Sequence, residues 1–295
     1  MNQVIQAVGF GLVTASILSI ASVGFTLQFG VTNVLNIAYG SVMIASAFVA
    51  YYITTTGVPF VVAATMATAF GAGLSVLMNR LVYTPFIRRG TRLFGMIIVT
   101  ISMGLIIQNL ILCIVGPKFV SLPVGSGDSQ KFGAIVLTDT QLVVIALAIA
   151  AMIGVHVVLK YTPLGKSMRA AGSNAALARA SGISVTRVAD VAWAISGALC
   201  GLAGVVLALN TASFQSTTGD EFLVVIIAAA VLGGIGYPYG AVVGSAIIGV
   251  GMEVAALAFG SSYKEIFAFS ILVLVLLVRP KGIFADVAGR REVAA

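Results

Sequence analysis

The sequence predicts an all-α polytopic membrane protein with about eight or nine transmembrane helices. Hydrophobic residues fill 60% of its 295 positions and charged residues only 8%, whereas a soluble domain carries about 25% charged residues. Several apolar runs reach the length of about 20 residues that a helix needs to cross a bilayer. These runs lack the alternating segments of about ten residues that mark the strands of a membrane barrel, so helices are predicted.

Composition also excludes some kinds of site and partner. The net charge of +7 does not require a nucleic-acid partner, because the cations gather in loops on one predicted side of the membrane. Cys113 and Cys200 lie in apolar runs, where small core residues are typical and metal ligands or disulfides are not. The N-terminal Met1-Asn2-Gln3 contains no lysine or arginine, which argues against a cleaved signal peptide.

Nine apolar segments are predicted within a single transmembrane domain that comprises residues 1–295. In chain order they cover 4–27, a run ending near 52, a run ending near 81, 94–115, 141–159, 188–209, 222–232, a run ending near 259, and a run ending at 279. Of the 16 lysines and arginines, only Lys118, Lys131 and Lys264 fall on the predicted outside. Because cytoplasmic loops carry most of the positive charge, the N-terminus is expected outside and the tail at 279–295 in the cytoplasm.

Two glycine-bearing breaks, at residues 28–40 and 233–240, interrupt the apolar segments. Backbone that is not helical is tolerated at membrane depth only against protein or a water-filled cavity. Paired broken helices in inverted repeats mark transport pathways, so an inverted repeat is predicted from topology alone. An ordinary cytoplasmic turn with a helix cap is the alternative for the first break. The predicted substrate-pathway residues in the breaks are Asn36, Tyr39, Gly40, Gly233, Gly234 and Gly236.

Three further titratable residues, Glu253, His156 and Asp190, lie in the apolar segments. Glu253 is the one acid well inside an apolar segment, where a carboxylate by default marks a pathway or a proton relay. The alternative for Glu253 is a hydrogen bond between helices. His156 is the only histidine, so the sequence offers no second histidine for metal or acid–base chemistry, and a packing or interfacial role is expected. Asp190 is placed to pair with Arg187, three residues earlier on a helix.

The insert at residues 160–187 is the longest basic segment, with five cations and no acid. Pro163 predicts that the preceding helix ends here, Ser173 or Asn174 can cap a short alanine-rich helix, and Gly182 can end that helix. A rigid cytoplasmic helix with small side chains would offer a surface to a soluble partner. The alternative is a structured loop that only stops translocation.

The same insert excludes an ATP site in this chain. Gly165-Lys166-Ser167 matches the end of a phosphate-binding loop, but Lys160 occupies the position of its leading glycine and no strand precedes it. The sequence also lacks the HExxH and GxSxG motifs of metalloproteases and serine hydrolases. No catalytic residue, metal site or cofactor is therefore predicted, and any ATP must be bound by a partner.

Five groups of residues occur in a fixed order along essentially the whole chain. They are RLVYTP at 80–85 with QNL at 108–110 and GP at 116–117, MRAA at 168–171 with Asn174, Ala178 and Gly182, GLAG at 201–204, GGIG at 233–236 with Gly240 and Gly244, and RPKGIF at 279–284. Together they resemble the LivH family, the permeases of branched-chain amino acid ABC importers. The family pattern Asn-Phe-Ala-His-Gly-Glu is replaced here by residues 36–41, NIAYGS, so urea, amides or other small amino acids are alternative substrates.

The resemblance implies a bacterial inner-membrane permease with a periplasmic N-terminus and a cytoplasmic C-terminus. Its partners would be a homologous second permease, two cytoplasmic ATPase subunits, a periplasmic substrate-binding protein and the membrane lipid. The short cytoplasmic helix would dock on the ATPase, through predicted coupling residues Arg169, Asn174, Arg179 and Gly182. The alternative function, a stand-alone secondary transporter, would need an intramembrane coupling group, for which the chain offers only Glu253 and His156.

Overall fold

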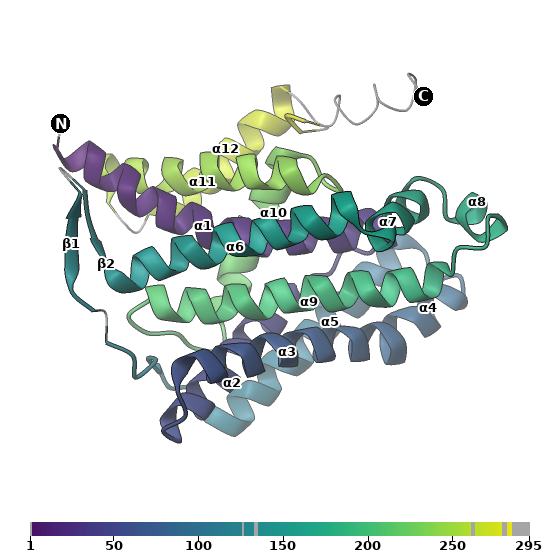
Figure 1. Ribbon diagram of the computed structural model, residues 1–295, viewed down its shortest axis with the longest axis horizontal. Helices are drawn as coiled ribbons and strands as arrows, with labels where there is room; N and C mark the ends of the chain where they lie inside the picture. Colours follow the sequence, from purple (N-terminus) through teal and green to yellow (C-terminus); the bar gives the residue numbers. More distant parts are fainter. Residues whose placement is uncertain (1, 126, 133–134, 261–262, 279–281, 285–295) are drawn as a thin grey trace. The chain divides into compact units, whose positions relative to one another are not determined.

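The computed structural model describes residues 2–125, 127–132, 135–260, 263–278 and 282–284. Residues 279–281 and the predicted basic tail, with Arg290 and Arg291, lie outside the described residues. Each predicted apolar segment corresponds to a helix, which confirms the all-α polytopic class (Figure 1). In chain order these helices are α1 (Asn2–Thr32), α2 (Tyr39–Thr55), α3 (Phe60–Met78), α5 (Leu93–Val115), α6 (Asp139–Tyr161), α9 (Val185–Asn210), α10 (Thr218–Gly233), α11 (Pro238–Phe259) and α12 (Lys264–Val278).

Six helical runs within the described residues are long and apolar enough to cross a membrane. They are α1, the continuous run from α3 to Arg88, α5, α6, α9 and α11. Helices α2, α10 and α12 have 17, 16 and 15 residues, short of the length of about 20 that a full crossing needs. The predicted eight or nine segments thus comprise six long helices and three shorter apolar ones.

Short elements join these helices. A π-helix, η1 (Asn79–Tyr83), and α4 (Thr84–Arg88) extend α3. Two strands, β1 (Ser129–Phe132) and β2 (Ile135–Thr138), form an antiparallel hairpin between α5 and α6. The sequence predicted only a polar loop there, because four-residue strands give almost no periodic signal.

The chain divides into two compact units. Unit 1 comprises residues 1–26, 124–150 and 224–295, and unit 2 comprises 27–123 and 151–223. Three of the four boundaries fall inside α1, α6 and α10, so each of these helices contributes to both units.

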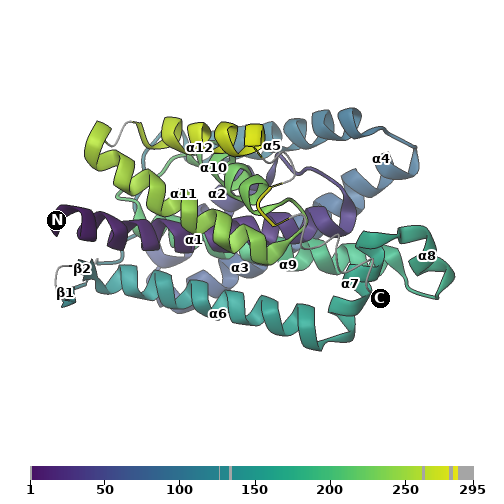
Figure 2. The same ribbon diagram turned by 90° about the horizontal axis from the view of Figure 1, so that it is seen from above.

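Unit 2 is built on close helix packing through small residues. Helices α3 and α9 run side by side (Figures 1 and 2), and α2 packs against both. A Cβ atom at Gly71 of α3 would lie 2.6 Å from the carbonyl oxygen of Gly197 on α9, and one at Gly201 would lie 2.9 Å from that of Ala67. Membrane helices associate through such contacts, because lipid offers no hydrophobic driving force between them.

Unit 1 contains the second predicted break and a similar glycine contact. Helix α10 ends at Gly233 and α11 starts at Pro238. Gly240 and Gly244 pack against the α10 backbone, whereas Gly236 has a φ of 89° and belongs to the turn. That φ value lies in a backbone region that favours glycine.

The predicted break at residues 28–40 is confirmed, although it is shorter than expected. Helix α1 continues to Thr32, Asn33 adopts a φ of 56°, and α2 begins at Tyr39. Asparagine is one of the few residues that enters this left-handed region readily, so it can end a helix as glycine does.

The basic insert folds as two short helices, α7 (Pro163–Ser173) and α8 (Ala175–Ala180), where one was predicted. The Oγ1 atom of Thr162 accepts a hydrogen bond from the backbone N–H of Gly165, at 3.2 Å. Thr162 and Pro163 therefore start α7, because proline fits the first position of a helix well. Asn174 caps α8 as predicted: its Oδ1 accepts from the N–H groups of Ala176 and Leu177, both at 3.0 Å.

Candidate functional site

The first break is held by a buried cluster of polar side chains in unit 2. Asn36 is 1% exposed; its Oδ1 accepts from the Tyr83 hydroxyl at 3.3 Å and its Nδ2 donates to Gln28 Oε1 at 3.4 Å. Ser196 of α9 donates to the same Gln28 oxygen at 3.4 Å. The Thr100 hydroxyl of α5 donates to the Leu35 carbonyl at 3.1 Å. The break is thus tied to η1, α5 and α9, as backbone at membrane depth requires.

Replacing Tyr83 with phenylalanine should lower the free energy of unfolding by about 1 kcal/mol, because it leaves the buried Asn36 oxygen without its donor. Thermal unfolding in detergent would measure the effect. Tyr52→Phe is the matched control, since Tyr52 is 45% exposed and its hydroxyl can bond to water. Equal shifts in the two variants would contradict the role assigned to the cluster.

Tyr39 and Gly40 lie at the start of α2 and are buried. The Tyr39 hydroxyl donates to the Ser196 carbonyl at 3.4 Å. Gly40 packs directly on Gly219 at the start of α10, where a Cβ on either residue would overlap the other's carbonyl oxygen. Next to this contact, the Ser41 hydroxyl donates to Asp220 Oδ1 at 3.1 Å. The N-terminal ends of two short helices thus meet inside unit 2, a juxtaposition that the sequence did not predict.

The other predicted pathway residues lie in unit 1. Gly233 packs on Gly240, and Gly234 has a φ of 102° and contacts Gly282. The structure therefore groups Asn36, Tyr39 and Gly40 in one unit and Gly233, Gly234 and Gly236 in the other.

Glu253 is half-buried on α11 and forms an ion pair. Both of its carboxylate oxygens accept from Lys264 Nζ, each at 2.7 Å, and Oε1 also accepts from Thr14 Oγ1 at 3.1 Å. The bond from Thr14 is the hydrogen bond between helices that was the alternative interpretation of Glu253. The ion pair with Lys264 was not predicted from the sequence. A pathway role for Glu253 stays a prediction and would require this pair to open.

The predicted coupling residues differ in what they contact. Arg169 donates to the carbonyl of Leu159 near the end of α6, Asn174 caps α8, and Gly182 ends that helix with a φ of 82°. All four residues are exposed. Of the two arginines, Arg179 forms neither a side-chain hydrogen bond nor an ion pair with a described residue, whereas Arg169 is bonded to Leu159. Leu177, two residues earlier on α8, is an apolar side chain that is 65% exposed, and its role could not be predicted from the sequence.

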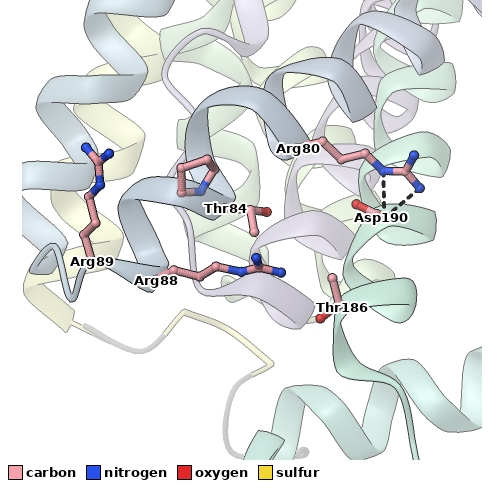
Figure 3. A pocket seen from close by; sticks show the side chains of 7 residues that line it. Arg80, Thr84, Arg88, Arg89, Thr186 and Asp190 are labelled. Carbon is pink, nitrogen blue, oxygen red and sulfur yellow. Dashed lines mark hydrogen bonds and ion pairs between the residues drawn. The ribbon is translucent and has the colours of Figure 1, made fainter.

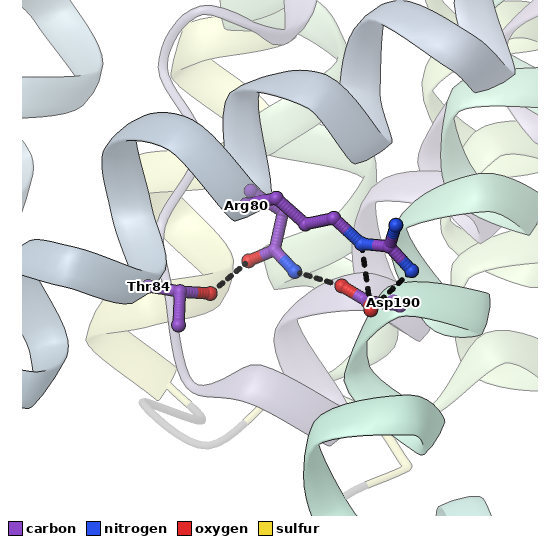
Figure 4. A network of polar contacts seen from close by, with 4 residues as sticks. Arg80, Thr84 and Asp190 are labelled. Carbon is purple, nitrogen blue, oxygen red and sulfur yellow. Dashed lines mark hydrogen bonds and ion pairs between the residues drawn. The ribbon is translucent and has the colours of Figure 1, made fainter.

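Asp190 pairs with a different partner from the one predicted. Instead of Arg187, it bonds to Arg80, with Arg80 Nε 3.0 Å and Nη2 2.9 Å from Asp190 Oδ2 (Figures 3 and 4). Its Oδ1 accepts from Asn79 Nδ2 at 2.8 Å, and Asn79 Oδ1 accepts from Thr84 at 3.4 Å. The network joins η1 and α4 to α9. Arg80 and Asp190 are 110 residues apart in the chain, whereas helical spacing rules relate only residues three or four apart.

Histidine and cysteine are the remaining residues whose side chains could take part in chemistry. No group of three or more histidine, cysteine or acidic side chains that could hold a metal occurs in the part of the chain that the structure describes. His156 lies edge-on to Tyr161, with ring centroids 6.1 Å apart. Cys200 is buried and its thiol contacts the Tyr39 carbonyl, whereas Cys113 is exposed.

Known proteins resemble this chain over most of its length. It is 30% identical over 302 residues to the high-affinity branched-chain amino acid transport system permease protein LivH of Escherichia coli (strain K12), covering 96% of this chain and 94% of that protein. It is 28% identical over 301 residues to the corresponding BraD protein of Pseudomonas aeruginosa, covering 96% and 95%. A solved chain of PsaBC from Streptococcus pneumoniae in complex with Fab has a TM-score of 0.53 at 13% identity, covering 95% and 94%, which shows a shared fold.

Residues 7–276 match the family described as branched-chain amino acid transport system / permease component. This is a family of transport permeases and not of enzymes, in keeping with the long apolar helices. The chain belongs to this permease family.

Proposed function

We propose that the chain is the transmembrane permease subunit of an ATP-binding-cassette importer in the bacterial inner membrane. Its cargo would be a branched-chain or other small amino acid, as the names of LivH and BraD suggest. It would assemble with a homologous second permease, two cytoplasmic ATPase subunits that bind the ATP, and a periplasmic substrate-binding protein. The N-terminus would lie in the periplasm and the C-terminus in the cytoplasm, as the distribution of lysine and arginine favours.

The observation that carries this proposal is the way the basic insert is attached to the spans of unit 2. A Cβ atom at Gly165 of α7 would overlap the backbone of Leu159 in α6, and one at Gly172 would overlap the carbonyl oxygen of Gly30 in α1. Arg169 adds a hydrogen bond to that same Leu159 carbonyl. Helix α7 is therefore packed without a gap against the ends of two apolar helices.

This packing provides a mechanical route from a soluble partner to the membrane. A displacement of α8, with its exposed Leu177 and Arg179, would move α7 and with it the end of α1. Gly30 is only three residues before Asn33, where the first break begins. ATP-driven movement of the partner would thus reach the break, so that the pathway opens alternately to the two sides.

Two residues at the first break bear on the choice of substrate. Tyr39 and Ser41 occupy positions where the LivH pattern has a histidine and an acid, and both are engaged with neighbouring residues in unit 2. A screen of amino acids, amides and urea against the partner binding protein would identify the cargo.

The proposal is tested by purifying the tagged chain from its native membranes. We expect it to retain ATPase activity that vanadate inhibits, whereas the chain expressed alone should have none. A chain that copurifies with no ATPase, or one that is fully active in transport without it, would contradict the assignment.

A further inference from the structure

A cavity of about 500 Å³ lies in unit 2 between α4 and the first turn of α9 (Figure 3). Its lining includes Arg80, Thr84, Arg88, Arg89, Thr186 and Asp190. Three arginines and one aspartate give the cavity a net charge of +2, so its lining favours an anion. None of them is among the predicted pathway residues or the predicted coupling residues Arg169, Asn174, Arg179 and Gly182.

Two of the three arginines are available to a ligand. The Arg80 guanidinium is already bonded to Asp190, whereas Arg88 and Arg89 form no ion pair with any residue that the structure describes. Arg88 extends from α4 toward Thr186 of α9 (Figure 3). A guanidinium can hold a phosphate with two parallel hydrogen bonds, so Arg88 is the central candidate ligand.

The start of α9 adds further donors at the same place. Ser184 is the N-cap of α9, but its side chain makes no capping hydrogen bond. The first backbone N–H groups of a helix have no partner within the helix and favour a negative charge. Thr186, the second residue of α9, lines the cavity, so the helix end and Arg88 face the same space.

The position of the cavity along the helix matches the depth of lipid headgroups. The candidate span runs from Phe60 to Arg88, and at 1.5 Å per residue Arg80 lies about 30 Å and Arg88 about 42 Å from its start. The hydrocarbon core is about 30 Å thick and the headgroups extend the bilayer to about 40–45 Å. With Phe60 at one edge of the core, Arg80 would mark the other edge, and the backbone of Arg88 would lie just beyond the adjoining headgroup layer, which is about 5–8 Å deep. The long arginine side chain can reach back to that layer.

Apolar side chains close in sequence to the cavity's arginines are exposed. Leu77, Leu81 and Ile87 are 53%, 67% and 45% exposed, and they flank the arginines in sequence. A ligand that carries both a phosphate and acyl chains would satisfy the cavity and cover these side chains. An acidic segment of a soluble protein would satisfy only the charge.

We propose that this cavity binds the phosphate headgroup of an anionic phospholipid, with Arg88 as its main ligand. Basic pockets between transmembrane helices suit such headgroups. The bound lipid would contact both α4 and α9 next to the Arg80–Asp190 pair. It would thereby stabilise the packing of η1 and α9, which are hydrogen-bonded to the first break.

Native mass spectrometry of the full-length chain, purified with the subunits it retains, tests the proposal. The probes are phosphatidylglycerol, phosphatidylcholine with the same acyl chains, and inorganic phosphate. We expect phosphatidylglycerol to be retained preferentially, and Arg88→Gln to weaken that retention about fivefold. Arg88→Lys should keep much of it, because the charge remains. The matched control is Arg92→Gln, since Arg92 is exposed on the same basic segment but does not line the cavity.

Four results would overturn the proposal. Equal losses in Arg88→Gln and Arg92→Gln would show a general effect of surface charge, and equal retention of the two lipids would show that the headgroup is not selected. Displacement of the lipid by inorganic phosphate at similar concentrations would indicate a soluble anion site. Loss of the ATPase subunits from Arg88→Gln with unchanged lipid retention would make the cavity a protein-docking surface.

Discussion

Replacing Gly71 with leucine should lower the free energy of unfolding by about 3 kcal/mol or more, because the helices α3 and α9 have no space for a side chain there. A Cβ atom at Gly71 would already lie 2.6 Å from the Gly197 carbonyl oxygen and 2.9 Å from the Ser46 hydroxyl. Neither neighbour is the flexible end of a long side chain, so the helices would have to separate. Thermal unfolding in detergent should show a decrease in Tm of at least about 5 °C.

Gly73 is the matched control on the same helix. A Cβ atom at Gly73 meets nothing within 4 Å, so Gly73→Leu should leave the Tm within about 2 °C of the parent chain. The two variants differ in helix face and not in helix propensity. If both destabilise the chain equally, the close packing of α3 on α9 does not hold unit 2 together.

The second large effect is expected at Arg179. Reversing its charge with Arg179→Glu should lower ATP-dependent uptake about tenfold or more, because a charge of the wrong sign opposes the docked partner. Membrane insertion should be unaffected, since Arg179 is exposed and forms no ion pair with a described residue. Uptake and partner-stimulated ATP hydrolysis, measured on the same preparation, separate loss of coupling from loss of protein.

Lys166→Glu provides the control for this charge reversal. Lys166 is exposed on α7 in the same basic insert, so both variants change the charge of the insert equally. We expect Lys166→Glu to retain uptake within about twofold of the parent chain. Equal losses in both variants would point to the overall charge of the insert, and no loss in Arg179→Glu would remove the docking role of α8.

Much of the helical architecture could be predicted because its signal is local. A run of about 20 apolar residues has few alternatives to a membrane helix, so each predicted segment corresponds to a helix. The breaks could be predicted for the same reason, since Asn33, Gly234 and Gly236 adopt backbone angles that few other residues accept. The start of α7 was missed because Thr162-Pro163 was interpreted as a helix end, although a proline fits the first helical position equally well.

The partners of individual side chains could not be predicted, because they come from distant parts of the chain. Asp190 has Arg187 within helical reach, but it pairs with Arg80, since η1 places Asn79 and Arg80 together beside α9. Glu253 acquires Lys264 only when α11 and α12 fold back on one another. The contact of Gly40 with Gly219 depends on the meeting of α2 and α10, and no spacing rule relates residues so far apart. The pathway roles of Asn36, Tyr39 and Gly40 remain predictions.

The central claim is that this chain transports its solute only when separate ATPase subunits drive it. Uptake of radiolabelled branched-chain amino acids into proteoliposomes tests this claim most directly, with the chain reconstituted alone and with its copurified partners. We expect accumulation only when the partners, the binding protein and ATP are all present. Accumulation by the chain alone, driven by an ion gradient and without ATP, would contradict the account and identify a secondary transporter.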